Sequence, residues 1–205
     1  MKAILGIVGA LVLVILIFVF VQYRKIQTAA ACPAKEIASS RMEKNGDTWH
    51  LTFTSKFDAP LDRVYDAFQH PERAVEFVPE NVRKSEVVSE DGNSKTIDIV
   101  GSLDILPPGF KVQSLRNVYT FNPAEHRITI ATSNKLIDAN SELKFEPIAD
   151  GKGTLLTVTQ TNKQKQPLPT EALEKGALCE TYATQVRAVN RALKLAPPAK
   201  GAAAG

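Results

Sequence analysis

Hydrophobic positions along this chain follow three different patterns. An unbroken apolar run of nineteen residues, Ala3–Val21, comes first, an alternation of period two begins at Trp49, and a helical stripe follows Glu171. A helix as long as the first run measures about 28 Å, close to the thickness of the hydrocarbon core of a bilayer. The first pattern predicts a single membrane-spanning helix, and the other two predict a folded domain that combines strands and helices.

The length of the apolar run favours a retained membrane anchor over residues 1–25. A cleaved secretory signal has an apolar core of about 7–15 residues that is followed closely by small residues. Here Gln22–Lys25 come first and Ala29–Cys32 only later. Lipidation of Cys32 is a minor alternative, because Ala29 stands where lipoprotein signals prefer leucine. The basic excess lies on the C-terminal side of the run, which favours a cytoplasmic domain. A two-residue tail with Lys2 can also stay inside and send the domain out, so the side of the membrane stays open.

Composition divides the rest of the chain into three parts. Residues 26–47 are polar, rich in alanine and without a sustained period, which predicts a linker. Residues 48–196, about 150 in number, suffice for one hydrophobic core but not for two. Residues 197–205 begin with two prolines that end the last helix, and they predict a disordered tail.

The alternating pattern predicts an antiparallel sheet of about seven strands. Trp49, Leu51, Phe53 and Phe57 lie at alternate positions of the opening strand. A helix over Leu61–Phe68 and a helical turn follow that strand. Turn residues then separate six further strand segments. The turn is predicted over 72–77, and the strands over 82–88, 95–103, 110–121, 127–133, 141–145 and 154–161.

A long helix over Glu171–Leu195 closes the domain. Thr170 is placed to cap it, and an apolar stripe runs along it. At about 1.5 Å per residue the helix is about 37 Å long, enough to cross the whole predicted sheet. We expect this stripe to be buried against the sheet. The stripe consists of Leu173, Ala177, Leu178, Tyr182, Val186, Val189 and Leu193.

Charge and motif content argue against several functions. The 25 basic and 22 acidic residues are interspersed and the net charge is only +3, so there is no concentrated basic face for nucleic acid. His50, His70 and His126 are scattered, with no cysteine or second histidine at metal-ligand spacing. We find no phosphate-binding loop and no nucleophile motif, and we expect no metal, no cofactor and no catalytic residue.

The two cysteines are too few for a framework of disulfides. Cys32 lies in the predicted linker and Cys179 in the predicted closing helix. We therefore expect a spacer thiol and a small buried core residue rather than a bonded pair.

Three segments resemble a known superfamily. Residues 57–68 are an opening strand that runs into a helix, residues 77–88 are a Phe-x-Pro segment before a Lys-Ser-Glu-Val strand, and residues 153–158 are a late strand. Together with the order of elements, they make the domain resemble the START-like (SRPBCC) superfamily, in particular its polyketide cyclase/dehydrase and coenzyme Q-binding branch. The resemblance covers about residues 48–195. It implies an α+β helix-grip fold, in which a curved sheet wraps around the last helix and leaves a hydrophobic cavity.

Members of that superfamily bind lipids, quinones, hormones or polyketides in the cavity, and some are enzymes. On this resemblance and on strand parity, we take eight residues as candidates for the cavity wall. Asn117, Gln160 and Arg116 are further polar candidates, although an isolated polar strand residue is more often simply solvated. The eight candidates are Trp49, Leu51, Phe53, Ser55, Tyr119, Leu178, Tyr182 and Val186.

The turn around Pro107 is a candidate gate. Ile105, Leu106 and Phe110 surround this stiff bend, whereas hairpin tips are normally polar. Contact with a ligand, with a bilayer or with the mouth of a cavity would explain an apolar tip. A loop that folds back onto its own core is an equal alternative.

These patterns predict a binding or transfer module for a hydrophobic small molecule or lipid, tethered to a membrane. Tethering helps because an apolar ligand partitions into the bilayer, where an anchored receptor meets it at high local concentration. Two alternatives stay open. One is a cyclase or aromatase-like enzyme that acts on an apolar substrate, and the other is an interaction domain whose core is filled by its own side chains.

Overall fold

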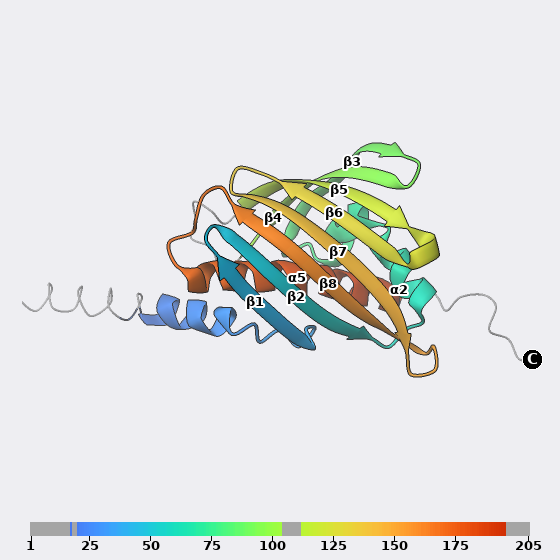
Figure 1. Ribbon diagram of the computed structural model, residues 1–205, viewed down its shortest axis with the longest axis horizontal. Coiled ribbons are helices and arrows are strands. Elements are labelled where there is room, and N and C mark those ends of the chain that lie inside the picture. Colours follow the sequence, from blue (N-terminus) through green and yellow to red (C-terminus); the bar gives the residue numbers. More distant parts are fainter. Residues whose placement is uncertain (1–16, 18–19, 104–111, 196–205) are drawn as a thin grey trace, which may run out of the picture.

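The computed structural model describes residues 17, 20–103 and 112–195. Within them, eight strands form one antiparallel sheet in the order β1-β2-β8-β7-β6-β5-β4-β3 (Figure 1). The predicted α+β class is confirmed, and the predicted number of about seven strands is too low by one. The strands are β1 (Ser39–Asn45), β2 (Thr48–Phe57), β3 (Val82–Asp91), β4 (Ser94–Ser102), β5 (Val112–Asn122), β6 (Arg127–Ser133), β7 (Ile137–Ile148) and β8 (Gly153–Gln164).

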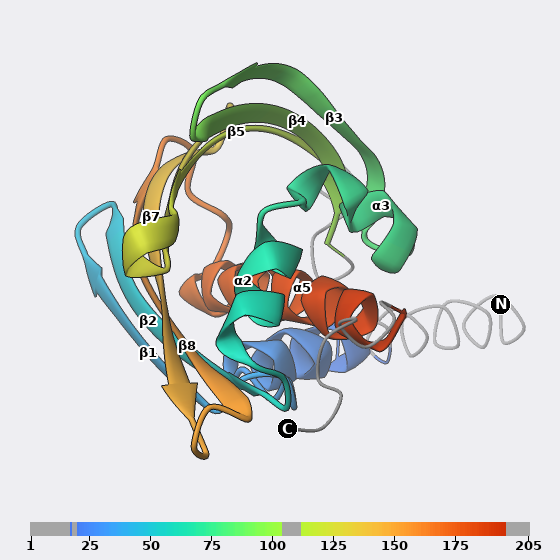
Figure 2. The ribbon, with the colours of Figure 1, turned by 90° about the vertical axis from the view of Figure 1, so that its right-hand side faces the viewer.

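The helices that follow β2 and β8 lie on the concave side of the sheet (Figure 2). Three short pieces follow β2: α2 (Leu61–Phe68), the 3-10 turn η1 (Pro71–Arg73) and α3 (Ala74–Phe77). Figure 2 shows the sheet curling around α2, α3 and the long helix α5 (Glu171–Leu195). This arrangement buries the inner face of the sheet, as period-two alternation requires.

Helix α5 has the predicted bounds, and the predicted stripe is buried at four positions and half-buried at Ala177, Leu178 and Leu193. The Thr170 side chain accepts a hydrogen bond from the backbone N–H of Leu173 at 3.2 Å, which caps the helix. Tyr182 and Val186 belong to the main hydrophobic core. Glu174 is a charged residue of the same helix that is also buried, with only 1% of its surface exposed.

Much of the segment predicted as a linker is folded against the domain. Residues 20–30 are helical, and Ile26 and Ala29 pack against Leu173 of α5. Strand β1 pairs with β2 along its whole length. Its sequence, SSRMEKN, has no apolar alternation, because it is an edge strand held by backbone pairing with few buried side chains.

The two cysteines form a disulfide, Cys32–Cys179, so the expectation of two unpaired thiols is wrong. Helix 20–30 packs against Leu173 of α5 and brings Cys32 to Cys179 in the first half of that helix, a proximity that no local pattern of the sequence encodes. The bond closes a loop of 147 residues and fixes the start of the domain to α5.

The predicted membrane helix over residues 3–21 lies largely outside the described residues. Only Ile17, Phe20 and Val21 of that run are described, and all three are exposed. Over the described ranges, no helix combines the length and the apolarity that crossing a bilayer requires. The predicted tail, residues 197–205, also lies outside them.

Candidate ligand-binding cavity

A cavity of about 260 Å³ lies between the inner face of the sheet and the helices. Strands β3–β8 form one wall, α5 forms the opposite wall, and the α2–α3 segment closes one end (Figure 2). Apolar residues dominate its surface, among them Phe68, Phe77, Ile99, Leu143, Leu178 and Val189. Such a volume is close to the lower end of the range for small-molecule sites.

Small residues on β4 and β7 line this space. Gly101, Ala139 and Ser141 line the cavity on β4 and β7. Ala139 is only 2% exposed, so its short side chain faces the cavity and not solvent. At comparable positions β2 carries aromatic rings that fill the space beneath α5.

Strand register places several polar residues in one row across the cavity wall. Asn117 of β5 lies opposite Thr132 of β6, and Thr132 lies opposite Ala139 of β7. Ala139 in turn lies opposite Asn162 of β8. Directly paired residues of antiparallel strands share a face, and all four line the cavity. The row therefore crosses the wall from Asn117 to Asn162.

A second row runs beside the first, two residues further along each strand. Tyr119 lies opposite Ile130, Ile130 opposite Ser141, and Ser141 opposite Gln160. These four residues also line the cavity. The sheet side of the cavity is thus a band of amide and hydroxyl groups set in an apolar frame.

Three buried polar atoms at the cavity have no hydrogen-bond partner among the described residues. They are Oδ1 of Asn117, Nδ2 of Asn162 and Oγ1 of Thr184. Their residues are 5%, 0% and 8% exposed, and all three line the cavity. A buried polar group without a partner costs about 1–3 kcal/mol, so each of these atoms lowers the stability of the chain.

Glu174 is the buried acid at one end of the cavity, and its oxygens are already engaged. Oε2 accepts hydrogen bonds from Lys44 Nζ at 2.6 Å and from Trp49 Nε1 at 2.9 Å. Oε1 accepts the backbone N–H of Leu168 at 3.2 Å. This carboxylate is therefore a structural group that joins β1, β2 and α5.

Tyr182 connects α5 to the opening strand instead of pointing a free hydroxyl into the cavity. Its ring stacks on Phe53 with centroids 4.5 Å apart, and its hydroxyl donates to Ser55 Oγ at 3.1 Å. Ser55 in turn donates to the carbonyl of Glu36 at 2.6 Å. Burial raises the pKa of Tyr182 to about 12. Burial also raises the pKa of Tyr119, so both phenols are neutral near pH 7.

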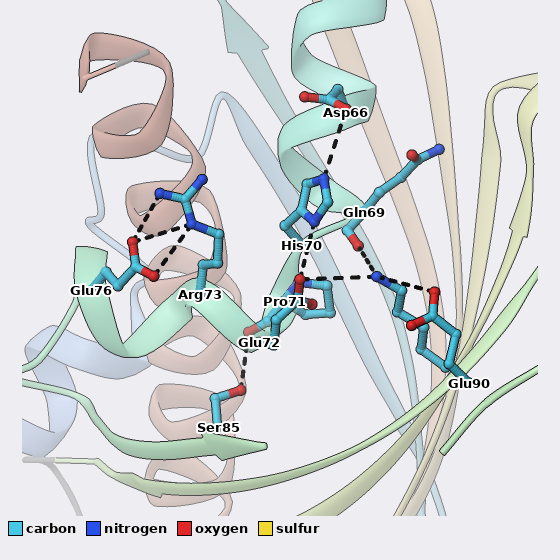
Figure 3. A network of polar contacts seen from close by, with 10 residues as sticks. Asp66, Gln69, His70, Pro71, Glu72, Arg73, Glu76, Ser85 and Glu90 are labelled. Carbon is cyan, nitrogen blue, oxygen red and sulfur yellow. Dashed lines mark hydrogen bonds and ion pairs between the residues drawn. The ribbon is translucent and has the colours of Figure 1, made fainter. Parts of the chain in front are cut away.

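A polar network holds the α2–α3 segment at the end of the cavity (Figure 3). His70, which lines the cavity, lies 3.0 Å from Glu72 and 3.8 Å from Asp66. Lys95 of β4 lies near Glu72 and donates to the backbone carbonyl of Gln69 at 3.4 Å. These contacts tie the segment to the sheet and keep that end of the cavity in place.

The predicted candidates separate into two groups. Tyr119, Leu178 and Tyr182 line the cavity, as do the further candidates Asn117 and Gln160. Arg116 faces outward and forms a bidentate pair with Asp98 at 2.8 Å. The remaining candidates are buried beside the cavity and do not line it: Trp49, Leu51, Phe53, Ser55 and Val186. The candidate gate residues Ile105, Leu106 and Phe110 lie outside the described residues.

Sequence reasoning missed Asn162, Thr184, Ala139 and the wall formed by α2–α3. Asn162 could have been found, because it shares the inward parity of Leu156 and Val158 on the same strand. A polar residue at an inward position was the available signal.

Comparison with solved structures identifies the architecture. The Zhui aromatase/cyclase from a Streptomyces species matches with a TM-score of 0.56 and 15% identity, over 71% of this chain and 96% of that one. A START superfamily protein from Mycobacterium smegmatis matches with a TM-score of 0.55 and 16% identity, over 71% and 97% of the two chains. The chain has the helix-grip fold.

A third solved structure shares this architecture. Ara h 8.0201 matches with a TM-score of 0.56 and 17% identity, over 72% of this chain and 98% of that one. No family model matches the sequence, and no curated protein matches it as a relative. Identities this low show the fold alone, and the function must be argued from the cavity.

Proposed function

We propose that this chain is a binding or transfer module for a hydrophobic small molecule or lipid, which it holds between the sheet and α5. We also propose that the chain is tethered to a membrane. The single observation that carries the proposal is the cavity of about 260 Å³, walled mainly by apolar side chains, at the place where the helix-grip fold leaves space beneath its long helix. The apolar run over residues 3–21 supports tethering, because an anchored receptor meets a bilayer-soluble ligand at high local concentration.

Binding is favoured over cyclase chemistry by the state of the ionisable groups. A general base must be within reach of the substrate and poised to take a proton. Among the described residues of the cavity, Glu174 already accepts three hydrogen bonds, and the pKa values of Tyr119 and Tyr182 are raised. His70 is paired with two carboxylates at one end. These groups are better suited to forming a cavity wall than to general acid–base catalysis.

The disulfide supports an oxidising compartment for the domain. Disulfides persist in secreted, periplasmic and other extracytoplasmic proteins and are rare where thiols are kept reduced. Cys32–Cys179 joins the start of the domain to α5, and Cys179 is only 3% exposed. We therefore propose that the domain lies on the non-cytoplasmic side of a membrane, a question that the flanking charges leave open.

Co-purification tests the proposed function. The full-length chain is purified in a mild detergent, and organic extracts are compared by mass spectrometry with those of Ala139→Phe, whose ring would occupy the cavity. We expect an apolar molecule at near-stoichiometric amount with the parent and at a several-fold lower amount with the variant. Equal amounts from both chains, at equal folded fraction, would overturn the proposal, because the molecule would then come from the detergent micelle.

A further inference from the structure

The polar band on the cavity wall restricts which hydrophobic molecules fit. A cavity for a plain hydrocarbon would need no buried amides, because each unpaired polar group in it destabilises the protein. Here the wall carries Asn117 and Asn162 in one row, and Tyr119, Ser141 and Gln160 in the next. The unpaired atoms Asn117 Oδ1, Asn162 Nδ2 and Thr184 Oγ1 all belong to cavity-lining residues.

The chemistry and spacing of these atoms define a pattern. Asn117 Oδ1 accepts a hydrogen bond, Asn162 Nδ2 donates one, and the Thr184 hydroxyl does either. Asn117 and Asn162 are three strands apart in one row, which is about 14 Å along the sheet. Curvature of the sheet shortens the direct path. A ligand that satisfies both ends must therefore carry polar groups at separated positions on its skeleton.

The described residues that line the cavity offer no free charged group to a ligand. Among the described residues that line the cavity, only Glu174 and His70 have acidic or basic side chains. Both Glu174 oxygens are engaged, and Lys44 pairs with this carboxylate at 2.6 Å, so the ion pair offers no free charge to an ionic ligand. His70 has Asp66 and Glu72 as neighbours at the α2–α3 end. No described cation in the cavity stands ready to pair with an anionic ligand.

We infer that the ligand is an uncharged lipophile with at least two separated hydroxyl or carbonyl groups, and not a plain hydrocarbon chain or a fatty acid. This inference rests on the proposed function and names the chemical class of the molecule bound at that site. Asn162 and Asn117 are 0% and 5% exposed without a ligand, so their side chains must turn toward the cavity to donate to one ligand oxygen and to accept a hydroxyl at the other end. Thr184 of α5 bonds from the opposite wall.

Matched probes test the inference on the full-length chain in one fixed detergent. The probes are decanol, the decanediol with a hydroxyl at each end, and decanoate. Binding is measured as the rise in melting temperature with probe concentration, followed by the fluorescence of the single tryptophan, Trp49. Ala139→Phe, measured in parallel, reports the effect of each probe on the micelle. The difference between the two chains is the signal of cavity binding.

In a purely apolar cavity the second hydroxyl of the diol would weaken binding about tenfold or more, because it would be buried without a partner. We expect the diol to bind the parent at least as tightly as decanol, and decanoate to bind at least tenfold more weakly than either. A diol that binds tenfold more weakly than decanol would overturn the inference and leave the proposed function standing. If no probe distinguishes the parent from Ala139→Phe, the proposed function itself fails.

Variants of the wall assign the effect to the named atoms. Thr184→Val removes an unpaired hydroxyl with little change in shape, and Asn117→Leu removes an unpaired acceptor. Each is expected to weaken the diol severalfold relative to decanol. The matched control is Thr161→Val, which is next to Asn162 on the same strand but exposed on the outer face, and it should change neither probe.

A second measurement needs no probe. Because an unpaired buried hydroxyl destabilises the protein, Thr184→Val should raise the melting temperature of the chain without probe, whereas Thr161→Val should leave it unchanged. A Thr184→Val chain that melts lower than the parent and binds the diol normally would contradict the assignment of this hydroxyl to the ligand.

Discussion

Along the inner face of the sheet, β2 carries Trp49, Phe53 and Phe57, each at most 1% exposed, whereas the wall of β5 and β7 carries Asn117 and Ala139. The aromatic side packs tightly on α5, with the Phe53 ring stacked on Tyr182. The polar side leaves a cavity beneath the same helix. One sheet and one helix thus form a solid core at one side and a cavity at the other.

The difference shows how this fold separates stability from binding. Large buried apolar side chains supply most of the hydrophobic stabilisation, at about 25 cal/mol per Å² of buried apolar surface. Small and polar side chains forgo part of it and leave atoms free to meet another molecule. Each variant below acts on one of the two sides, so its effect measures how far the separation holds.

Phe53→Ala should have the largest effect, because it removes a fully buried ring from the solid side. Truncation of buried phenylalanine costs about 3–5 kcal/mol of unfolding free energy. Urea unfolding followed by circular dichroism measures the loss. If the chain fails to fold, Phe53→Leu is the milder substitute and should cost less. A loss below about 1 kcal/mol would mean that the stack on Tyr182 is not part of a tight core.

Removing the disulfide should have the next largest effect. Cys32→Ser together with Cys179→Ala opens the loop that joins the start of the domain to α5, and loss of a native disulfide typically costs about 2–5 kcal/mol. The free energy of unfolding measures the change. The parent in strong reductant is the control and should match the double variant. A parent insensitive to reductant would show that the two thiols are not bonded.

Alkaline pH should lower the free energy of unfolding through ionisation of Tyr182. Its pKa is about 12 in the folded chain against about 10 in an unfolded one, so the folded state holds the proton more tightly. The contribution is complete below pH 10 and is lost as the pH rises towards 12, about 3 kcal/mol in all.

Unfolding free energies of the parent and of Tyr182→Phe, measured at pH 8 and at steps up to pH 12, check this prediction. The variant should lose less stability than the parent over that interval, because it lacks the ionising group. Parallel pH curves for the two chains would contradict the burial of the phenol.

Two matched alanine-to-phenylalanine substitutions should have the smallest effects on stability, and these effects should differ clearly from each other. Ala183→Phe places a ring at a position of α5 that is 2% exposed and does not line the cavity, so overpacking should cost about 1–3 kcal/mol. Ala139→Phe places the same ring in the cavity and should cost less than about 1 kcal/mol. Melting temperatures compare the two. Equal losses would mean that the cavity has no room to spare.

Elements of the solid side could be predicted well from the sequence. Helices Leu61–Phe68 and Glu171–Leu195 have the predicted bounds, because apolar spacing, a proline before one helix and a cap before the other all agree. The opening strand was found from four aromatic and aliphatic residues at one parity. Consistent local signals are strongest where side chains pack against each other.

In the strands that line the cavity, the same local sequence signals are weaker. The strand over 141–145 was predicted too short, because Asp138 and Asn140 disfavour a strand and Ala139 gives little apolar signal. Asn117, Gln160 and Asn162 interrupt the inward apolar positions of their strands. The residues that open the cavity are therefore the ones that break the alternation.

Long-range pairings were out of reach for a different reason. The disulfide and the contact of Lys44 with the buried Glu174 join residues that are far apart in the sequence. No local period reports such contacts. The sequence predicted a linker where the structure has a strand, since β1 depends on its neighbour for its conformation.

The contact of Lys44 with Glu174 determines where the protein can be trimmed for expression. A fragment that starts at Thr48, where the apolar alternation begins, would lack the cation that neutralises a carboxylate 1% exposed. It would also expose the backbone edge of β2 to pairing with other chains. Fragments for crystallisation or delivery studies should therefore begin before Cys32, so that they keep both the edge strand and its covalent tie.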